Sequence, residues 1–566
     1  MLDQEERLKA LDPRFSWIVQ APAGSGKTEL LVGRFLTVLA QVQEPEEVLA
    51  ITFTRKAASE MQARIMGALF YALKNKEPQK AHQKINFDLA RKVLKQDEIR
   101  GWKLLEQPSR LRISTIDSLC ASLTAMLPMT ARFGENFQVS EQAYLLYEKA
   151  IDQLLLGLKD NLPFNSALKS CLLYLDNRLD QFKNLLVVML SRRSMWLDII
   201  LKINSEAEFE IILRRSLANL IQESVDNLHR EWPEDLGQEL WGIFSLIVSP
   251  PAGEKGLGRE PKGREGGSLK DFKSLADLLL TDKNQLRKKV DKRQGFLPKT
   301  PEKARMEELL EQLESYPGFI EQLIRIRILP SLSHHENSVT HELTPEGQAL
   351  IQDLIQVLKA AVAYLKIIFQ AEKTVDFDEI SMTALEALGA EDSPTDIMLR
   401  LDHQLSHLLV DEYQDTSQLQ YRLFSSMVRG WQKGDGRTVF LVGDPMQSIY
   451  KFRQADVGLF LKTIDQGLGP VNLNFIQLKI NFRSSPEVIS WINQTFEILF
   501  PKSKEGMFGA VTYAKSFSMN DIVSPLVGET GQQALPVGQR GGYTHSGVKT
   551  RSEERRVGKE CLRLCR

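Results

Sequence analysis

The stretch Ala21-Pro22-Ala23-Gly24-Ser25-Gly26-Lys27-Thr28 decides the fold of the first part of this chain. It follows an apolar run at residues 17–19, which predicts a buried strand, and it precedes apolar residues at helical spacing in 30–36. A glycine-rich turn between a strand and a helix directs backbone N–H groups at an anion. Lys27 adds an ammonium group for phosphate oxygens, and Thr28 adds a hydroxyl for Mg²⁺. We therefore predict a phosphate-binding loop, although position 21 holds alanine where the strict pattern has glycine.

Length, charge and cysteine content limit the class of protein. At 566 residues the chain exceeds the roughly 250–300 residues at which single cores stop growing, so several domains are expected. The net charge of −1 gives no whole-chain attraction to nucleic acid, so any such surface is local. No apolar run approaches the ~20 residues of a membrane span, and residues 1–6 are polar, unlike a secretory signal. Cys120 and Cys171 lack metal-ligand spacing. We expect a cytoplasmic protein with no membrane partner.

The pattern of strands and helices divides the chain. Short apolar runs at 48–53 and 112–116 predict strands separated by helices, and strand signals return at 407–410, 439–442 and 474–478. Between them, leucine-rich segments such as 144–158, 209–228 and 349–371 have helical periodicity. We predict an α/β lobe with a parallel sheet at 1–125 and 375–470, an all-helical insertion at 126–374, the start of a second lobe at 471–540, and a tail at 541–566.

The last sixteen residues, RSEERRVGKECLRLCR at 551–566, are dense in charge and have little apolar periodicity. They resemble translated vector sequence, and we leave them out of the fold prediction. A native basic tail that touches nucleic acid is the alternative.

A pair of carboxylates completes the predicted phosphate site. Asp411 and Glu412 directly follow the apolar run at 408–410. Asp411 is placed to hold Mg²⁺, and Glu412 to polarise the water that attacks a γ-phosphate. Long insertions between parallel strands are tolerated in such sheets, so the distance from Lys27 along the chain is no obstacle.

A second polar segment follows the strand at 439–442. In Gly443-Asp444-Pro445-Met446-Gln447, the amide of Gln447 is suited to sense a γ-phosphate. Tyr450 and Phe452 alternate with Lys451 and Arg453. Flat aromatic faces beside cations are typical of single-stranded nucleic-acid binding, where stacking contributes about 1–3 kcal/mol per base.

Six sequence blocks occur in a fixed order, at 21–28, 51–58, 114–119, 410–416, 442–453 and 481–485. In these blocks the chain resembles the superfamily 1 helicases of the UvrD, Rep and RecB type, and is most similar to bacterial UvrD-helicase-domain proteins related to RecB and AddA. The resemblance covers residues 1–125 and 375–500. It implies that the α/β lobe is a RecA-like P-loop NTPase lobe and that a second RecA-like lobe begins after it.

The resemblance also implies residue roles. Lys27, Thr28, Asp411 and Glu412 form the ATPase centre, and Thr28 and Asp411 hold Mg²⁺. Around the loop that holds ATP, Phe482 stacks on adenine, Arg483 contacts the γ-phosphate, and Gln4 reads the adenine edge. Gln447 couples nucleotide state to DNA. The residues implied to face single-stranded DNA or its phosphates are Phe53, Thr54, Ser114, Tyr450, Phe452 and Arg453.

The implied activity is that of an ATP-dependent DNA helicase or translocase, moving 3′ to 5′ on single-stranded DNA or on a duplex with a 3′ overhang, in repair or recombination. A separate nuclease subunit is an implied partner. After Arg483 we find neither the Thr-x-His-x-x-Lys-Gly-Leu-Glu block of the family nor its late arginine finger. We therefore expect an N-terminal fragment that hydrolyses slowly, because such a finger contributes about 10³–10⁵ in rate.

Other functions remain open at this point. An RNA helicase of the same superfamily shares most blocks, although residues 51–58 and 411–415 favour DNA. A fragment that binds nucleotide and DNA without unwinding is a second alternative. A P-loop kinase or GTPase is disfavoured, because the chain lacks an Asn-Lys-x-Asp guanine motif. Within the insertion, five cations offer additional phosphate contacts: Lys288, Lys289, Lys292, Arg293 and Lys299.

Overall fold

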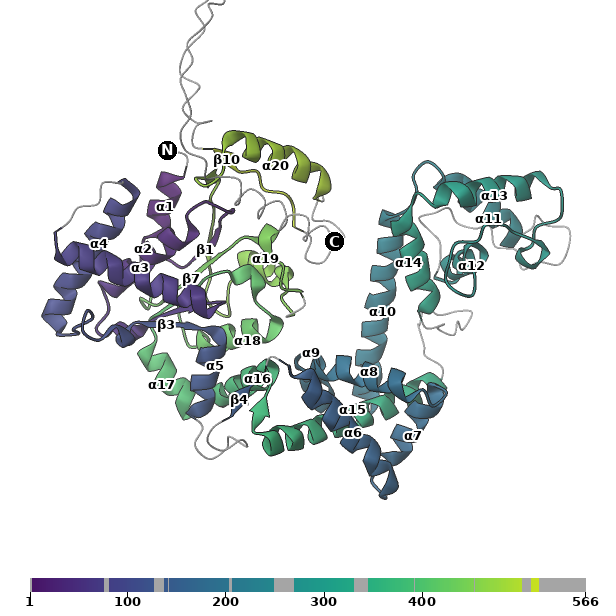
Figure 1. Ribbon diagram of the computed structural model, residues 1–566, viewed down its shortest axis with the longest axis horizontal. Helices are drawn as coiled ribbons and strands as arrows, with labels where there is room; N and C mark the ends of the chain where they lie inside the picture. Colours follow the sequence, from purple (N-terminus) through teal and green to yellow (C-terminus); the bar gives the residue numbers. More distant parts are fainter. Residues whose placement is uncertain are drawn as a thin grey trace, which may run out of the picture. The chain divides into compact units, whose positions relative to one another are not determined.

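The computed structural model describes residues 3–75, 81–126, 137–140, 142–202, 206–248, 269–329, 345–390, 392–451, 454–500 and 511–518. Its centre is a six-stranded sheet in the order β3-β2-β6-β7-β1-β8, in which every pairing is parallel (Figure 1). The predicted α/β fold with a parallel sheet is confirmed. The strands are β1 (Trp17–Gln20), β2 (Val48–Thr52), β3 (Arg112–Thr115), β6 (His407–Val410), β7 (Thr438–Gly443) and β8 (Asn474–Gln477).

Successive residues of the central strands enter different cores, because side chains alternate across a sheet. In β1, Val19 packs with α2, α3 and α4, whereas Ile18 packs with α5, α16 and α18 on the opposite face. Both faces are covered, so β2, β6 and β7 are buried along their whole length and read as continuous apolar runs. The helices that cover the faces are α1 (Gln4–Ala10), α2 (Lys27–Leu39), α3 (Arg55–Leu73), α4 (Ala81–Arg100), α5 (Ile116–Ala125), α16 (Phe377–Leu388), α17 (Asp396–Gln404), α18 (Gln418–Met427) and α19 (Val457–Gln466).

The edge strand β8 corrects one predicted boundary. The sequence assigned residues 474–478 to the second lobe, but β8 pairs in register with β1, Ile18 opposite Phe475. A separate two-stranded sheet follows, in which β9 (Ile480–Asn481) pairs in parallel with β10 (Phe517–Ser518). Helix α20 (Pro486–Leu499) lies between these two strands in the sequence. β8 is only four residues long and partly exposed. A strand this short has no sequence pattern that indicates which sheet it joins. The tail at 541–566 lies outside the described residues.

The insertion enters and leaves the lobe through a short strand pair, β4 (Gln138–Val139) and β5 (Thr374–Val375). Five helices then share one core: α6 (Tyr144–Leu156), α7 (Asn165–Tyr174), α8 (Leu179–Leu190), α9 (Arg193–Lys202) and α15 (Pro345–Glu372). A separate core joins α10 (Glu206–Arg230), α11 (Gly237–Val248), α12 (Leu269–Leu279), α13 (Pro301–Leu313) and α14 (Pro317–Ile328). The predicted helices at 144–158, 209–228 and 349–371 correspond to α6, α10 and α15.

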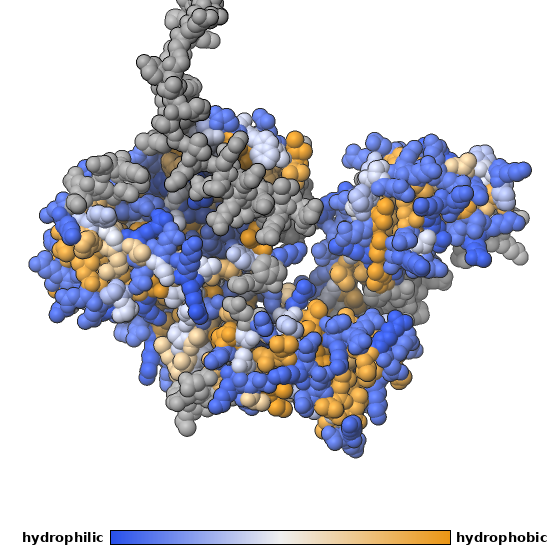
Figure 2. Space-filling model, in the orientation of Figure 1, coloured by the Kyte–Doolittle hydropathy of each residue, from blue (hydrophilic) through white to orange (hydrophobic). Residues whose placement is uncertain are grey.

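Helix α15 is the one described helix that is long and apolar enough to cross a membrane, with a mean hydropathy of 1.5 over its apolar window. Its residues Val357, Ala361, Leu365 and Phe369 are fully buried against α6, α7 and α8. Packing inside the insertion therefore accounts for this apolar face. The surface of the insertion is mostly hydrophilic, but apolar residues of α6 and α14 are exposed on it (Figure 2).

Candidate active site

The predicted loop lies at the carboxyl end of β1 and leads directly into α2. Gly24 and Gly26 have left-handed backbones, with φ of 74° and 77°, which glycine adopts without strain. A β-carbon at Gly24 would also lie 2.7 Å from the β-carbon of Arg483. The hydroxyl of Ser25 is buried and has no hydrogen-bond partner among the described residues. An unpaired buried donor beside a helix N-terminus fits a phosphate ligand.

The structure brings the loop lysine to the carboxylates. Nζ of Lys27 lies 3.2 Å from Oε2 of Glu412, and the Lys27 side chain is only 12% exposed. Asp411 directly follows β6, and its Oδ1 accepts a hydrogen bond from the backbone N–H of Glu412 at 3.0 Å. Glu412 itself has a left-handed backbone, with φ of 50°, which is uncommon for a residue with a side chain. Acid pair and ammonium therefore meet at one edge of the sheet.

Burial and the neighbouring charge of Glu412 raise the pKa of Asp411 to about 6, while Lys27 acts in the opposite direction. Burial likewise raises the pKa of Asp415 to about 6. Several carboxylates held together with a single ammonium form a site that favours an added cation. Among the described residues no group of three or more His, Cys, Asp and Glu side chains forms a metal cage. Mg²⁺ suits this arrangement, because it is commonly held by one or two protein ligands together with substrate phosphates.

A hydrogen-bonded chain links these acids to Gln447. Nε2 of Gln414 donates to Glu412 at 2.8 Å and to Asp415 at 3.2 Å, and its Oε1 accepts the backbone N–H of Asp444 at 2.9 Å. The side-chain amide of Gln447 in turn donates to the carboxylate of Asp444. Gln414 and Asp444 are almost fully buried. The sequence did not identify Gln414 as a site residue, although the polar run Gln414-Asp415-Thr416, one residue after the two acids, was a usable signal.

The predicted second-lobe residues contact the loop. The backbone N–H of Phe482 donates to the carbonyl of Gly24 at 2.9 Å. Asn481 holds the turn by accepting hydrogen bonds from the N–H groups of Arg483 and Ser484, at 2.8 and 3.1 Å. The Phe482 ring is 52% exposed, and the Arg483 side chain is exposed. Both side chains are therefore accessible beside the loop.

Helix α1 reaches the loop through a residue that the sequence analysis missed. Arg7 donates to the carbonyl of Ser25, and its guanidinium lies 5.4 Å from the centre of the Phe482 ring. Asp3 also accepts the backbone N–H groups of Lys479 and Ile480, at 2.9 and 2.8 Å. Gln4, the predicted adenine reader, is exposed at the first residue of α1. A lone arginine in a charged helix gave no signal, because only folding brings it to the loop.

The predicted nucleic-acid residues are only partly brought together. The rings of Phe53 and Tyr450 lie 4.6 Å apart with their planes tilted by 38°. Thr54 is the N-cap of α3, where its hydroxyl accepts the N–H of Ala57 at 3.1 Å, and Ser114 lies in β3 at the sheet edge. Phe452 and Arg453 lie outside the described residues. Phe53 and Tyr450 follow the carboxyl ends of β2 and β7, the same edge as the loop and the acids.

Comparison with known proteins agrees with this arrangement. The UvrD/REP helicase N-terminal domain matches residues 2–466. The chain is 27% identical over 539 residues to an ATP-dependent helicase/nuclease subunit of Exiguobacterium sibiricum, a match that covers 87% of this chain and 39% of that protein. It is 26% identical over 526 residues to the exonuclease/helicase protein RexA of Lactococcus lactis, covering 88% and 40%.

An ATP-dependent helicase/nuclease protein of Staphylococcus carnosus is similar at 27% identity over 541 residues, covering 89% of this chain and 40% of that protein. The chain thus spans about two fifths of the length of these relatives. The match to the domain extends over most of the chain, from α1 to the end of α19. The chain therefore belongs to the UvrD/REP helicase family.

Proposed function

We propose that this chain is the ATP-hydrolysing motor of a DNA helicase that moves 3′ to 5′ along single-stranded DNA in repair or recombination. The observation that carries the proposal is the contact between Lys27 and Glu412 at 3.2 Å, across the edge where the loop meets the acids. A P-loop lysine beside a strand-end carboxylate is the arrangement that phosphoryl transfer from ATP requires.

Each residue of the site has a role in this proposal. Lys27, the unpaired hydroxyl of Ser25 and the N–H groups at the start of α2 would hold phosphate oxygens. Thr28 and Asp411 would hold Mg²⁺, which supplies charge neutralisation at the phosphates when it is bound. Glu412 orients a water molecule and accepts its proton. Gln447, joined to Glu412 through Asp444 and Gln414, reports the state of the site.

The strand-binding role rests on the aromatic pair. Phe53 and Tyr450 offer stacking surface for bases at the same sheet edge as the ATP site. Closure of the second lobe on bound nucleotide would therefore change the contacts of this pair with a DNA strand. Phe482, which is exposed beside Arg7, is placed to stack on adenine, and Arg483 to approach the γ-phosphate. We propose single-stranded DNA, or a duplex with a 3′ overhang, as the substrate.

A partner is proposed from the names of the relatives. Those proteins are called helicase/nuclease or exonuclease/helicase subunits, and we propose that this chain likewise works beside a nuclease partner. In this proposal the chemistry of strand cleavage belongs to that partner.

The test is phosphate release from ATP by the full chain, with DNA and RNA oligonucleotides compared at equal concentration. DNA-stimulated hydrolysis that is lost in Lys27→Ala supports the proposal, whereas stronger stimulation by RNA would favour the RNA-helicase alternative. Partial duplexes with 3′ or 5′ overhangs then test direction. A chain that binds ATP and DNA but unwinds neither duplex would support the fragment without unwinding activity.

A further inference from the structure

Gln454 stands four positions after Tyr450 in the sequence, and its backbone has a φ of 62°. Its N–H donates to the carbonyl of Lys451 at 3.0 Å, and the next residue, Ala455, donates to the carbonyl of Tyr450 at 3.2 Å. A left-handed backbone is rare for a residue with a side chain, and it persists only where the surroundings hold it. Whatever holds Gln454 therefore also holds Tyr450.

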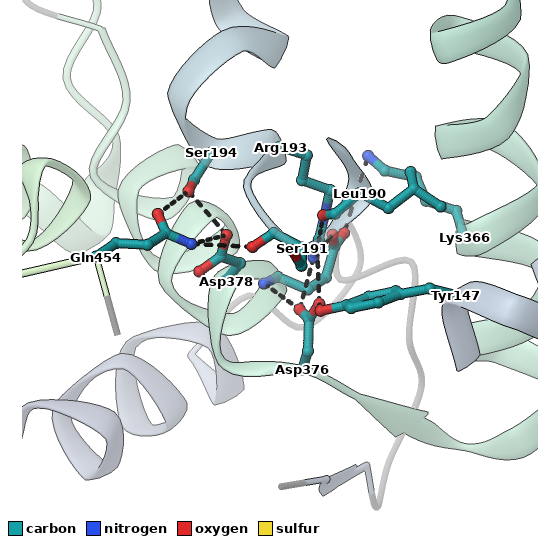
Figure 3. Close-up of polar contacts among 10 residues, drawn as sticks. Tyr147, Leu190, Ser191, Arg193, Ser194, Lys366, Asp376, Asp378 and Gln454 are labelled. Atoms are coloured by element: carbon teal, nitrogen blue, oxygen red, sulfur yellow. Dashed lines mark hydrogen bonds and ion pairs between the residues drawn. The ribbon is translucent and has the colours of Figure 1, made fainter. Parts of the chain in front are cut away.

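The side chain of Gln454 is seated in a polar socket (Figure 3). Its Nε2 donates to the carbonyl of Ser191 at 3.0 Å and to Oδ2 of Asp378 at 3.3 Å. The hydroxyl of Ser194 lies 3.1 Å from its Oε1 and 2.7 Å from Oδ2 of Asp378. The amide nitrogen is thus held by the turn before α9 and by α16, and the single proton of the Ser194 hydroxyl is available to either Asp378 or the amide oxygen.

The socket is rigid because a buried ion cluster lies behind it. Arg193 is fully buried and donates to both oxygens of Asp376, each at 2.6 Å, and to Glu379 at 3.0 Å. The hydroxyl of Tyr147, from α6, also donates to Asp376 at 2.5 Å. These contacts join α6, α9 and α16 (Figure 3). Removing one partner of a buried ion pair is strongly destabilising, so the cluster opposes separation of these helices.

Two parts of the protein meet at this socket. Ser191 and Ser194 belong to the helical insertion, whereas Asp378 lies on α16, which packs on α5 and α18 of the α/β lobe. Gln454 and Phe53 also line one cavity of about 320 Å³. Because the ion cluster joins α9 to α16, a displacement of the insertion would carry α16 with it and withdraw hydrogen bonds from Gln454. Through the Tyr450 carbonyl this would disturb the ring that lies 4.6 Å from Phe53.

We propose that Gln454 is a positioning residue that makes the strand grip of the Phe53–Tyr450 pair depend on the position of the helical insertion. This inference rests on the proposed function, because it requires that the pair bind a strand. A purely structural role for Gln454 would instead affect nucleotide and strand binding together.

The experiment uses the full chain and two titrations: a fluorescent ATP analogue without DNA, and a labelled oligothymidylate. Gln454→Gly removes the hydrogen-bonding side chain, but glycine still adopts the left-handed backbone without strain. Gln454→Ala removes the same side chain and in addition makes the left-handed backbone unfavourable. Because each lost hydrogen bond is worth a modest net free energy, we expect oligonucleotide affinity to fall about three- to tenfold in Gln454→Gly. Affinity for the ATP analogue is expected to stay unchanged.

A double-mutant cycle and a control identify the link. Asp378→Ala is expected to weaken strand binding similarly, and the double variant no further, since both remove one link. Asp198→Asn is the matched control: it breaks an exposed ion pair of 2.6 Å to Arg422, which joins the same helix α9 to α18, and it should leave both titrations unchanged.

Three outcomes would overturn the inference. If the wild type binds both ligands and Gln454→Gly binds the oligonucleotide with the same affinity as the wild type, the inference is refuted and the proposed function stands. An equal loss of nucleotide affinity, with a lower thermal unfolding midpoint, assigns Gln454 a structural role. A wild-type chain that binds neither ligand removes the proposed function and the inference with it.

Discussion

Replacing Glu412 by glutamine should separate nucleotide binding from hydrolysis. The substitution keeps the size of the side chain and an oxygen that can accept the 2.8 Å hydrogen bond from Gln414, so the linked chain to Gln447 survives. It removes the negative charge that faces Lys27 at 3.2 Å. Binding of a triphosphate must break this ion pair, whereas hydrolysis needs the carboxylate as a proton acceptor.

The magnitude follows from the exposure of the pair. The Glu412 side chain is 37% exposed, so solvent screens the interaction and the pair is worth about 0.5–1 kcal/mol. Freeing Lys27 should therefore tighten ATP binding about two- to fivefold. Loss of a general base should lower the DNA-stimulated hydrolysis rate by about 10²–10⁴.

The assay is titration with a fluorescent ATP analogue together with phosphate release in the presence of oligothymidylate. Glu60→Gln serves as the control, because it removes an exposed carboxylate paired with Arg64 at 2.7 Å on α3. Hydrolysis at the wild-type rate in Glu412→Gln, or weaker binding of the analogue, would refute the assignment of this residue as the base opposite Lys27.

Two further outcomes are expected. Because the pKa of Asp411 is raised to about 6 in the folded protein, its ionisation lowers the free energy of unfolding as pH rises through that value. Asp411→Asn should stabilise the fold by about 1–3 kcal/mol at about pH 8 and have no effect near pH 4 in urea unfolding, while hydrolysis is lost; no stability gain at the higher pH would contradict the burial argument. In the insertion, alanine at each of five exposed cations between α12 and α13 should reduce the salt slope of strand binding by about one per charge, and an unchanged slope would exclude phosphate contacts there. These cations are Lys288, Lys289, Lys292, Arg293 and Lys299.

The sequence determined the local elements of the site because their signals are local. A buried strand, two glycines and Lys27-Thr28 before an apolar helical segment specify the loop whatever lies elsewhere in the chain. The same holds for β6, β7 and the acids that follow β6, since strands buried on both faces read as continuous apolar runs. Helical periodicity likewise predicted α6, α10 and α15.

Only the tertiary structure decided which residues meet. The pairing of β8 with β1, the approach of Arg7 to Ser25, and the seating of Gln454 between Ser191 and Asp378 all join segments distant in sequence. None of these residues has an unusual neighbour pattern, because a single polar side chain on a helix or loop is ordinarily solvated. Their roles arise from tertiary packing. Packing is a property of the whole fold, so it produces no pattern among residues that are neighbours in the sequence.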